Sequence, residues 1–158
     1  MPGGHDEEGS LIRRSRWATE DGIVESREAP AFPGDRGRAV LLRRGRAAEG
    51  PARVRVVLPP LGAYGTQSLR EARRDDCGVW TARVGDLHPR WTGGGDVSCS
   101  EVGSTGAQFT FDLVLDAGQR HDLVLELGER QVSAAGLCAP SDPWSRTERS
   151  ACGRRSGL

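Results

Sequence analysis

Apolar and polar residues alternate most clearly over residues 53–58 (RVRVVL), where Val54, Val56 and Leu58 fall on one face and the two arginines on the other. Successive side chains of a β-strand point to opposite faces, so this pattern predicts a strand with one buried and one solvated face. A shorter apolar run, residues 39–42 (AVLL), precedes it, and the glycine and proline between them are typical of a turn. We therefore expect these two strands to form the central hairpin of the fold.

Two more alternating runs lie further along the chain, in residues 108–115 (QFTFDLVL) and 121–127 (HDLVLEL). The short, glycine-containing connection between them predicts a second hairpin. Because these runs hold the densest apolar stripes, we expect both strands to lie near the core. The residues that share a face are Phe109, Phe111, Leu113 and Leu115 in the first run, and Leu123, Leu125 and Leu127 in the second.

Other segments predict shorter strands at spacings of about ten residues. An Asp21-Gly22 turn joins two extended stretches, the alternation of residues 79–84 places Trp80 on an apolar stripe, and Pro89 predicts a peripheral strand over residues 87–91. The sequence Asp142-Pro143-Trp144 resembles a helix start. The chain is thus expected to be all-β, an antiparallel β-sandwich with room for a short C-terminal helix. We expect residues 1–10 to be a disordered tail, residues 11–133 the sandwich domain, and residues 134–158 a linker remnant or disordered tail.

Composition limits the function classes. The 158 residues suffice for one domain, and the 22 basic residues, all arginine, balance 22 acidic ones. A net charge of zero argues against nucleic-acid binding, and no apolar run approaches the ~20 residues of a membrane span. Without CxxC spacing or a secretory signal, the sequence predicts a soluble protein in a reducing, cytoplasmic compartment, with free thiols and no metal or cofactor. The cysteines are Cys77, Cys99, Cys138 and Cys152.

No motif in the sequence marks a catalytic site. GxSxG, P-loop, GxGxxG and HExxH patterns are missing, and the neighbouring Asp75 and Asp76 precede a glycine, which is simpler to explain as a turn. Aromatic rings that could stack on a sugar are the remaining candidates. Tyr64 lies in a loop, and Trp91 ends a strand beside a glycine-rich stretch. Each could contact carbohydrate or a protein partner, and packing within the sandwich is the alternative explanation for both.

Several longer motifs resemble the trehalase-like N-terminal domain of bacterial glycoside hydrolase family 15 proteins, relatives of glucoamylase and trehalase. The resemblance extends over residues 11–130, most of the chain. Its motifs are structural rather than catalytic. They are the Asp21-Gly22 turn, REAPAFPGD at 27–35, RAVLLRR at 38–44, EGPARVRVVL at 49–58, GVWTARVGDL at 78–87 and AGQRHDLVLEL at 117–127.

The resemblance implies a large β-sandwich, of the supersandwich kind, that precedes an (α/α)6 barrel. In the family the barrel carries the acid and base glutamates and hydrolyses α-linked glucose saccharides with inversion. The chain ends where the linker to the barrel would begin, so no catalytic residue of the family can be placed on it. We therefore expect a non-catalytic accessory domain in carbohydrate metabolism, whose partner is a barrel supplied in cis in relatives or in trans here, with α-glucosides as further candidate ligands.

Two other functions stay open. A free-standing carbohydrate-binding module would present an aromatic platform around Tyr64 or Trp91. An enzyme with an unrecognised site would need two carboxylates ~5–9.5 Å apart across a cleft.

Overall fold

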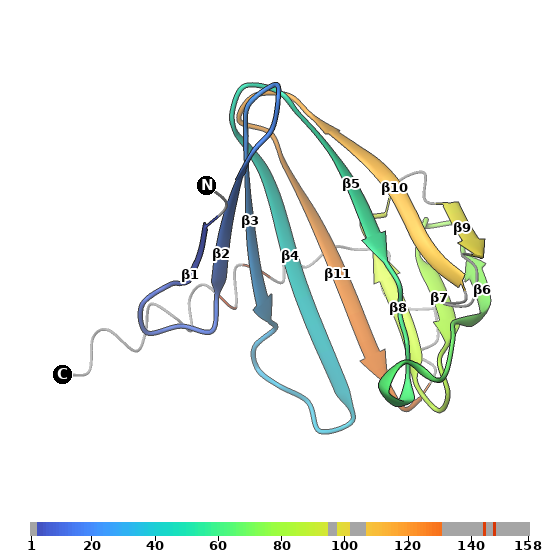
Figure 1. The fold of residues 1–158 in the computed structure, drawn as a ribbon. Coiled ribbons are helices and arrows are strands. Elements are labelled where there is room, and N and C mark those ends of the chain that lie inside the picture. Colours follow the sequence, from blue (N-terminus) through green and yellow to red (C-terminus); the bar gives the residue numbers. More distant parts are fainter. Residues whose placement is uncertain (1–2, 95–97, 102–106, 131–143, 145–146, 148–158) are drawn as a thin grey trace.

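Eleven strands form two antiparallel sheets in the computed structural model, which describes residues 3–94, 98–101, 107–130, 144 and 147 (Figure 1). The larger sheet has the order β1 (Gly3–Asp6), β2 (Arg13–Ala18), β3 (Ile23–Pro30), β4 (Arg38–Glu49), β11 (Arg120–Gly128), β8 (His88–Thr92), β7 (Trp80–Arg83) and β6 (Arg70–Arg74). The smaller has the order β5 (Ala52–Leu58), β10 (Ala107–Leu115) and β9 (Ser98–Glu101). A 3₁₀ turn, Ala63–Gly65, follows β5. The expected all-β sandwich is confirmed.

The core lies between the inner faces of the two sheets. Phe109 of β10 is at its centre, with its ring centroid 5.1 Å from that of Trp80 and 5.4 Å from that of Trp91 on the larger sheet. The strand faces predicted by the alternation are confirmed, since the apolar stripes of β5, β10 and β11 contribute Val56, Phe111 and Leu123 to this cluster. Period-two alternation therefore identified which side chains face the core.

Both expected long hairpins are wrong. β4 pairs with β3 and β11 in the larger sheet, whereas β5, which follows it directly, pairs with β10 in the smaller sheet. In the same way β10 belongs to the smaller sheet and β11 to the larger. Each short loop therefore carries the chain from one sheet to the other. The local signals for a turn are the same for a hairpin and for such a crossover, so they did not reveal the pairing partner.

The two crossovers and the β2–β3 hairpin meet at one end of the sandwich, where Figure 1 shows the strands converging. Ala47 of β4 donates its N–H to Gln119 O at 3.0 Å and accepts from Gly118 N at 2.8 Å, which joins the two crossovers. A Cβ atom at Gly22 would collide with the carbonyl of Glu49, so the predicted Asp21-Gly22 turn packs backbone to backbone against the β4–β5 crossover. Only glycine allows this approach.

The N-terminal residues, expected to be a disordered tail, include an edge strand. β1 pairs antiparallel with β2, and the residue after it, Glu7, donates its N–H to Ile12 O at 2.8 Å. The Glu7 carboxylate also accepts two hydrogen bonds from the Arg27 guanidinium, at 2.8 and 2.9 Å. Backbone pairing with an existing sheet edge thus orders a segment whose composition is polar and glycine-rich.

Strand β8, expected to be weak or peripheral because of Pro89, lies inside the larger sheet between β11 and β7. Its ladder with β7 covers Trp91 and Arg90 and resumes only at the Val84–Leu87 bridge, so the pairing with β7 is interrupted at Pro89. A proline has no N–H to donate to a ladder, which fits this interruption, and on its other side Pro89 pairs with Leu127 of β11. The residue is buried, and its strand is part of the core.

Trp144, at the predicted helix start, is fully buried against the outer face of the larger sheet. It packs with Ile12, Ala29 and Leu42, and the guanidinium carbons of two arginines lie 5.5 and 5.2 Å from its ring centroid. Trp144 and Thr147 have helical conformation. The rest of the expected helix and of the 134–158 tail falls outside the described residues. Within the described ranges, no helix is long and apolar enough to cross a membrane.

Replacing Trp144 with alanine should lower the free energy of unfolding by about 3–5 kcal/mol, because it removes a large buried ring from the sheet surface. Trp17→Ala is the matched control, since that ring is substantially exposed and its loss should cost much less. Urea denaturation followed by circular dichroism measures both. Equal losses in the two variants would contradict the packing of Trp144 described above.

Gly50→Ala should destabilise the fold by about 1–3 kcal/mol, because this residue has a φ of 69° and its added methyl group would collide with Asp21 O. Gly34→Ala provides the comparison, since a methyl group added there would meet no atom within 4 Å and its φ is ordinary. Thermal unfolding of the two variants distinguishes them. If both variants melt at the wild-type temperature, the close contact between the turns does not stabilise the fold.

Candidate functional site

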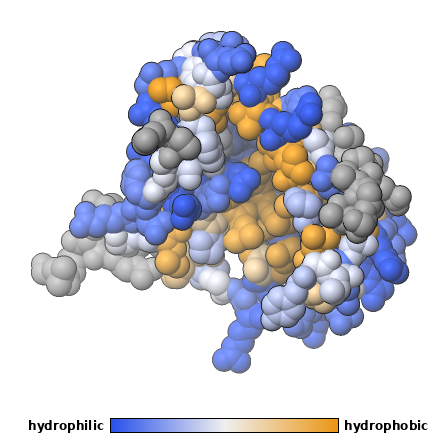
Figure 2. Space-filling model, viewed as in Figure 1, coloured by the Kyte–Doolittle hydropathy of each residue, from blue (hydrophilic) through white to orange (hydrophobic). Residues whose placement is uncertain are grey.

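An apolar groove opens between the sheets at the end away from the converging turns. It is a cavity of about 420 Å³ in which side chains of β3, β4 and β11 face those of β5. The space-filling view shows this hollowed apolar surface at the centre of the molecule (Figure 2). The apolar side chains most exposed along it are Leu11, Leu41 and Val57, at 76%, 45% and 44%.

The groove follows from the unequal size of the two sheets. Three strands cannot cover the inner face of eight, and β5 pairs with β10 alone among the described strands. Near the converging turns the sheets are closed by Val24, Ala47, Ala52 and Leu115. Charged side chains line only part of the groove, and two of them, Arg43 and Glu28, pair with each other at 3.0 Å. An apolar surface of this kind suits contact with another protein surface better than it suits chemistry.

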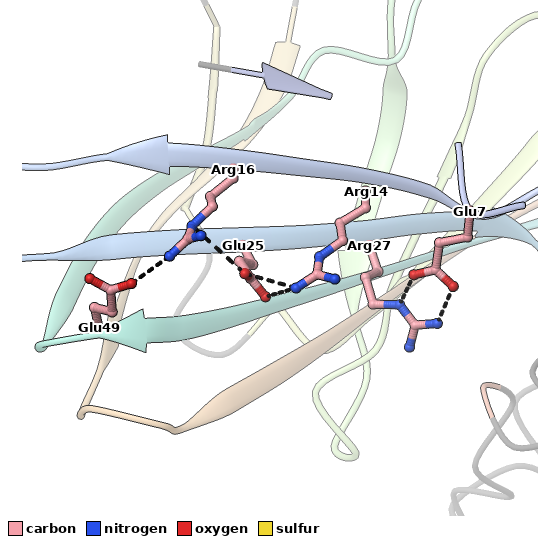
Figure 3. Close-up of polar contacts among 6 residues, drawn as sticks. All are labelled: Glu7, Arg14, Arg16, Glu25, Arg27 and Glu49. Carbon is pink, nitrogen blue, oxygen red and sulfur yellow. Dashed lines mark hydrogen bonds and ion pairs between the residues drawn. The ribbon is translucent and has the colours of Figure 1, made fainter. Parts of the chain in front are cut away.

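Ion pairs cross the outer face of strands β2, β3 and β4 (Figure 3). Arg14 donates two hydrogen bonds to the Glu25 carboxylate, both at 2.9 Å, and Arg16 reaches Glu25 at 3.8 Å and Glu49 at 2.5 Å. Beside them, the Glu7–Arg27 pair joins the N-terminal segment to β3. Every carboxylate in this row faces an arginine, so the row holds the edge of the sheet together and offers no free acid–base pair.

A buried ion pair lies on the outer face of the same sheet, further toward β6. Arg90 of β8 donates to the Glu126 carboxylate of β11 at 2.7 Å, and both side chains are about nine-tenths buried. Arg38 lies 3.2 Å from the second carboxylate oxygen, Oε2. The sequence gives no local signal for this pair, because Glu126 falls between Leu125 and Leu127, on the face that alternation predicts to be polar. Their partnership depends on the β8–β11 register, which was not predicted.

The two aromatic candidates lie in different environments. Trp91 is 3% exposed and packs against Phe109 and Phe111, so of the two explanations for this residue its ring fits packing within the sandwich and forms no surface platform. Its side chain lines the apolar groove from inside, and its role as a contact residue stays a prediction. Tyr64 is fully exposed in the 3₁₀ turn, at a φ of 55°, and does not line the groove. It too remains a predicted contact.

Cys77 is part of a disulfide bond, so the expectation that its thiol is free is wrong. The turn predicted around it is confirmed. Asp75 accepts hydrogen bonds at its Oδ1 from Cys77 N at 3.0 Å and from Val79 N at 2.8 Å, which explains the aspartates in structural terms. Among the described side chains, no group of three or more His, Cys, Asp and Glu residues is arranged to hold a metal ion.

Comparisons with known proteins give no further assignment. No family model matches the chain, no curated protein matches it, and no solved structure matches it.

Glu126→Ala should cost about 3–5 kcal/mol of stability, because it leaves the buried Arg90 charge without its partner. Asp112→Ala is the control from an exposed pair, in which Arg55 hydrogen-bonds the carboxylate. That hydrogen bond holds the pKa of Asp112 below its usual value. The pair therefore stabilises the folded protein slightly at pH values above the pKa of an ordinary aspartate. This stabilisation is lost as the pH falls through the lowered pKa of Asp112.

Urea denaturation at neutral pH measures both losses. The double variant Arg90→Met/Glu126→Leu should recover most of the stability, since apolar residues can replace a buried pair. A Glu126→Ala loss no larger than that of Asp112→Ala would contradict the burial of the pair.

Proposed function

We propose that the chain is a non-catalytic β-sandwich accessory domain of an α-glucoside hydrolase of the glucoamylase and trehalase type. Its partner is an (α/α)6 catalytic barrel, joined in cis in relatives or supplied in trans here. The motifs over residues 11–130 that resemble the family 15 N-terminal domain are the basis of this proposal. They imply a sandwich that supports a barrel and carries no catalytic residue itself.

The open apolar groove is the one structural observation that supports it. An accessory domain buries one face against its barrel, and when separated from the barrel it exposes that face to water. Leu11, Leu41 and Val57 are exposed side chains of the kind that such a contact would cover. The outer-face carboxylates Glu7, Glu25 and Glu126 are each paired with an arginine, so these three give no competing support for catalysis.

The groove also fits the barrel's chemistry in a simple way. Helices of an (α/α)6 barrel present side-chain ridges, and a groove lined by valine and leucine can receive an apolar ridge. The Arg43–Glu28 pair at its rim would supply the polar border that protein interfaces usually have.

A free-standing carbohydrate-binding module is the second candidate. The full exposure of Tyr64 favours it, because a solvent-facing ring can stack on a sugar. The burial of Trp91 weighs against it, since it leaves only one of the two candidate rings at the surface. Binding of soluble α-glucan that is lost in Tyr64→Ala and kept in groove variants would favour this second function.

We also propose a cytoplasmic location for the chain. A cytoplasmic location would require the Cys77 disulfide to persist under reducing conditions. An intact disulfide in protein isolated from cells, together with its ready reduction by thiols in vitro, would instead indicate an oxidising compartment.

The barrel contact can be tested with an (α/α)6 barrel from a family 15 enzyme whose own N-terminal sandwich has been removed. The wild-type chain should bind it in sedimentation-velocity experiments. Leu41→Arg, which places a charge in the groove, should weaken binding about tenfold or more, or ~1.4 kcal/mol.

Val114→Arg is the matched control, because Val114 is an exposed apolar residue of β10 that does not line the groove. This variant should bind the barrel as the wild type does. Full-strength binding by Leu41→Arg, or no association of the wild-type chain, would count against the accessory-domain function.

A further inference from the structure

A second cavity, of about 230 Å³, lies on the outer face of the larger sheet, where β6, β7, β8 and β11 run side by side. It is separate from the apolar groove and shares no lining residue with it. Its charged lining is mostly basic. The side chains that define it are Arg38, Arg73, Arg83, Arg90, Glu71 and Glu126.

Charge is unbalanced in this cavity. Four arginines and two glutamates leave an excess of two positive charges, although the whole chain is neutral. Arg90 hydrogen-bonds the Glu126 carboxylate at the floor of the cavity, and Arg83 donates its Nε–H to Gly85 O at 2.9 Å. Arg73 makes no ion pair or side-chain hydrogen bond with the described residues. A cavity of this kind attracts an anion, and a guanidinium can bind a carboxylate or phosphate through two parallel hydrogen bonds.

One carboxylate oxygen at the floor of the cavity accepts no hydrogen bond. Glu126 Oε2 is buried and forms an ion pair with Arg38 Nη2 at 3.2 Å. Buried carboxylate oxygens are nearly always hydrogen-bonded, and an ionised carboxylate can only accept. A ligand that reaches the floor would therefore gain most by presenting a hydroxyl group to this oxygen.

The rim carries a backbone conformation that is costly for its residue type. Glu71 has a φ of 54°, at the point where the β6–β7 register shifts between Arg70 and Arg73. A bulge of this kind redirects side chains, and strained non-glycine residues are concentrated at binding sites. Here the bulge places Glu71 and Arg73 on the same cavity.

We propose that this cavity binds a small anion that also carries hydroxyl groups, of the size of one sugar unit, such as a sugar phosphate or a sugar acid. The arginines take the anionic group, and Glu126 Oε2 accepts from a hydroxyl. The volume is below the ~300–1,000 Å³ of pockets that hold drug-sized ligands, which suits a single sugar unit. This proposal does not depend on the barrel contact.

Isothermal titration calorimetry of the full chain with four probes tests it: glucose 6-phosphate, glucuronate, glucose and inorganic phosphate. At least one of the two anionic sugars should bind, and comparing them distinguishes a phosphate from a carboxylate ligand. Glucose and inorganic phosphate should each bind about tenfold more weakly or worse, because each lacks one of the two interactions. Binding should weaken with added salt.

Arg73→Gln should weaken binding of the anionic sugar about tenfold. Arg70→Gln is the matched control, since it removes the same charge from the same strand at a position outside the cavity. Circular dichroism verifies that both variants are folded. The proposal is overturned if neither anionic sugar binds, if inorganic phosphate binds as tightly as glucose 6-phosphate, or if the two variants lose affinity equally.

Discussion

The contact among three turns at one end of the sandwich is the constraint on which the rest of the fold depends. The Asp21-Gly22 turn touches the β4–β5 crossover, and Ala47 hydrogen-bonds the β10–β11 crossover on its other side. Because both crossovers are short, the two sheets are forced close together there and are closed by small and medium apolar side chains. At the far ends of the strands a bridge from Leu69 to Ala107 of β10 joins the sheets near β6, at the opposite edge of the larger sheet from β3 and β4. The apolar groove opens where β5 faces β3 and β4. The surface proposed to meet the barrel is thus a consequence of where the chain changes sheets.

The sequence predicted the faces of the strands better than their partners. Alternation correctly placed Val54, Val56 and Leu58 inside, since it depends only on the two-residue period of a strand. The β2–β3 hairpin was also correct, because an Asp-Gly pair between two extended runs specifies a tight local return. The crossovers at Gly50 and Gly118 contain the same turn residues, and what sends the next strand to the other sheet is the packing of side chains distant in sequence. Edge strand β1 was missed for the same reason, since an existing strand supplied its hydrogen bonds.

Site prediction had a similar limit. Tyr64 and Trp91 are both aromatic residues near loops in the sequence, but the burial of Trp91 depends on Phe109 and Phe111 from the opposite sheet. Likewise, Arg90 and Glu126 are 36 residues apart, and only the β8–β11 register makes them partners. The groove and the basic cavity are both properties of pairing between distant strands. The sequence alone therefore does not show which residues line the groove or the basic cavity, because that depends on which strands pair.

The proposed role requires that this chain support catalysis without performing it. Its apolar groove is the surface proposed to meet a protein partner, and several of its described carboxylates, among them Glu7, Glu25 and Glu126, pair with arginines on the outer face. The most direct measurement is the release of glucose from trehalose and from maltose by the purified chain, with circular dichroism to show that it is folded. The folded protein is expected to release no glucose. Clear turnover would contradict the accessory role, and would mean that two carboxylates assigned here to turns and ion pairs act together on a glycosidic bond.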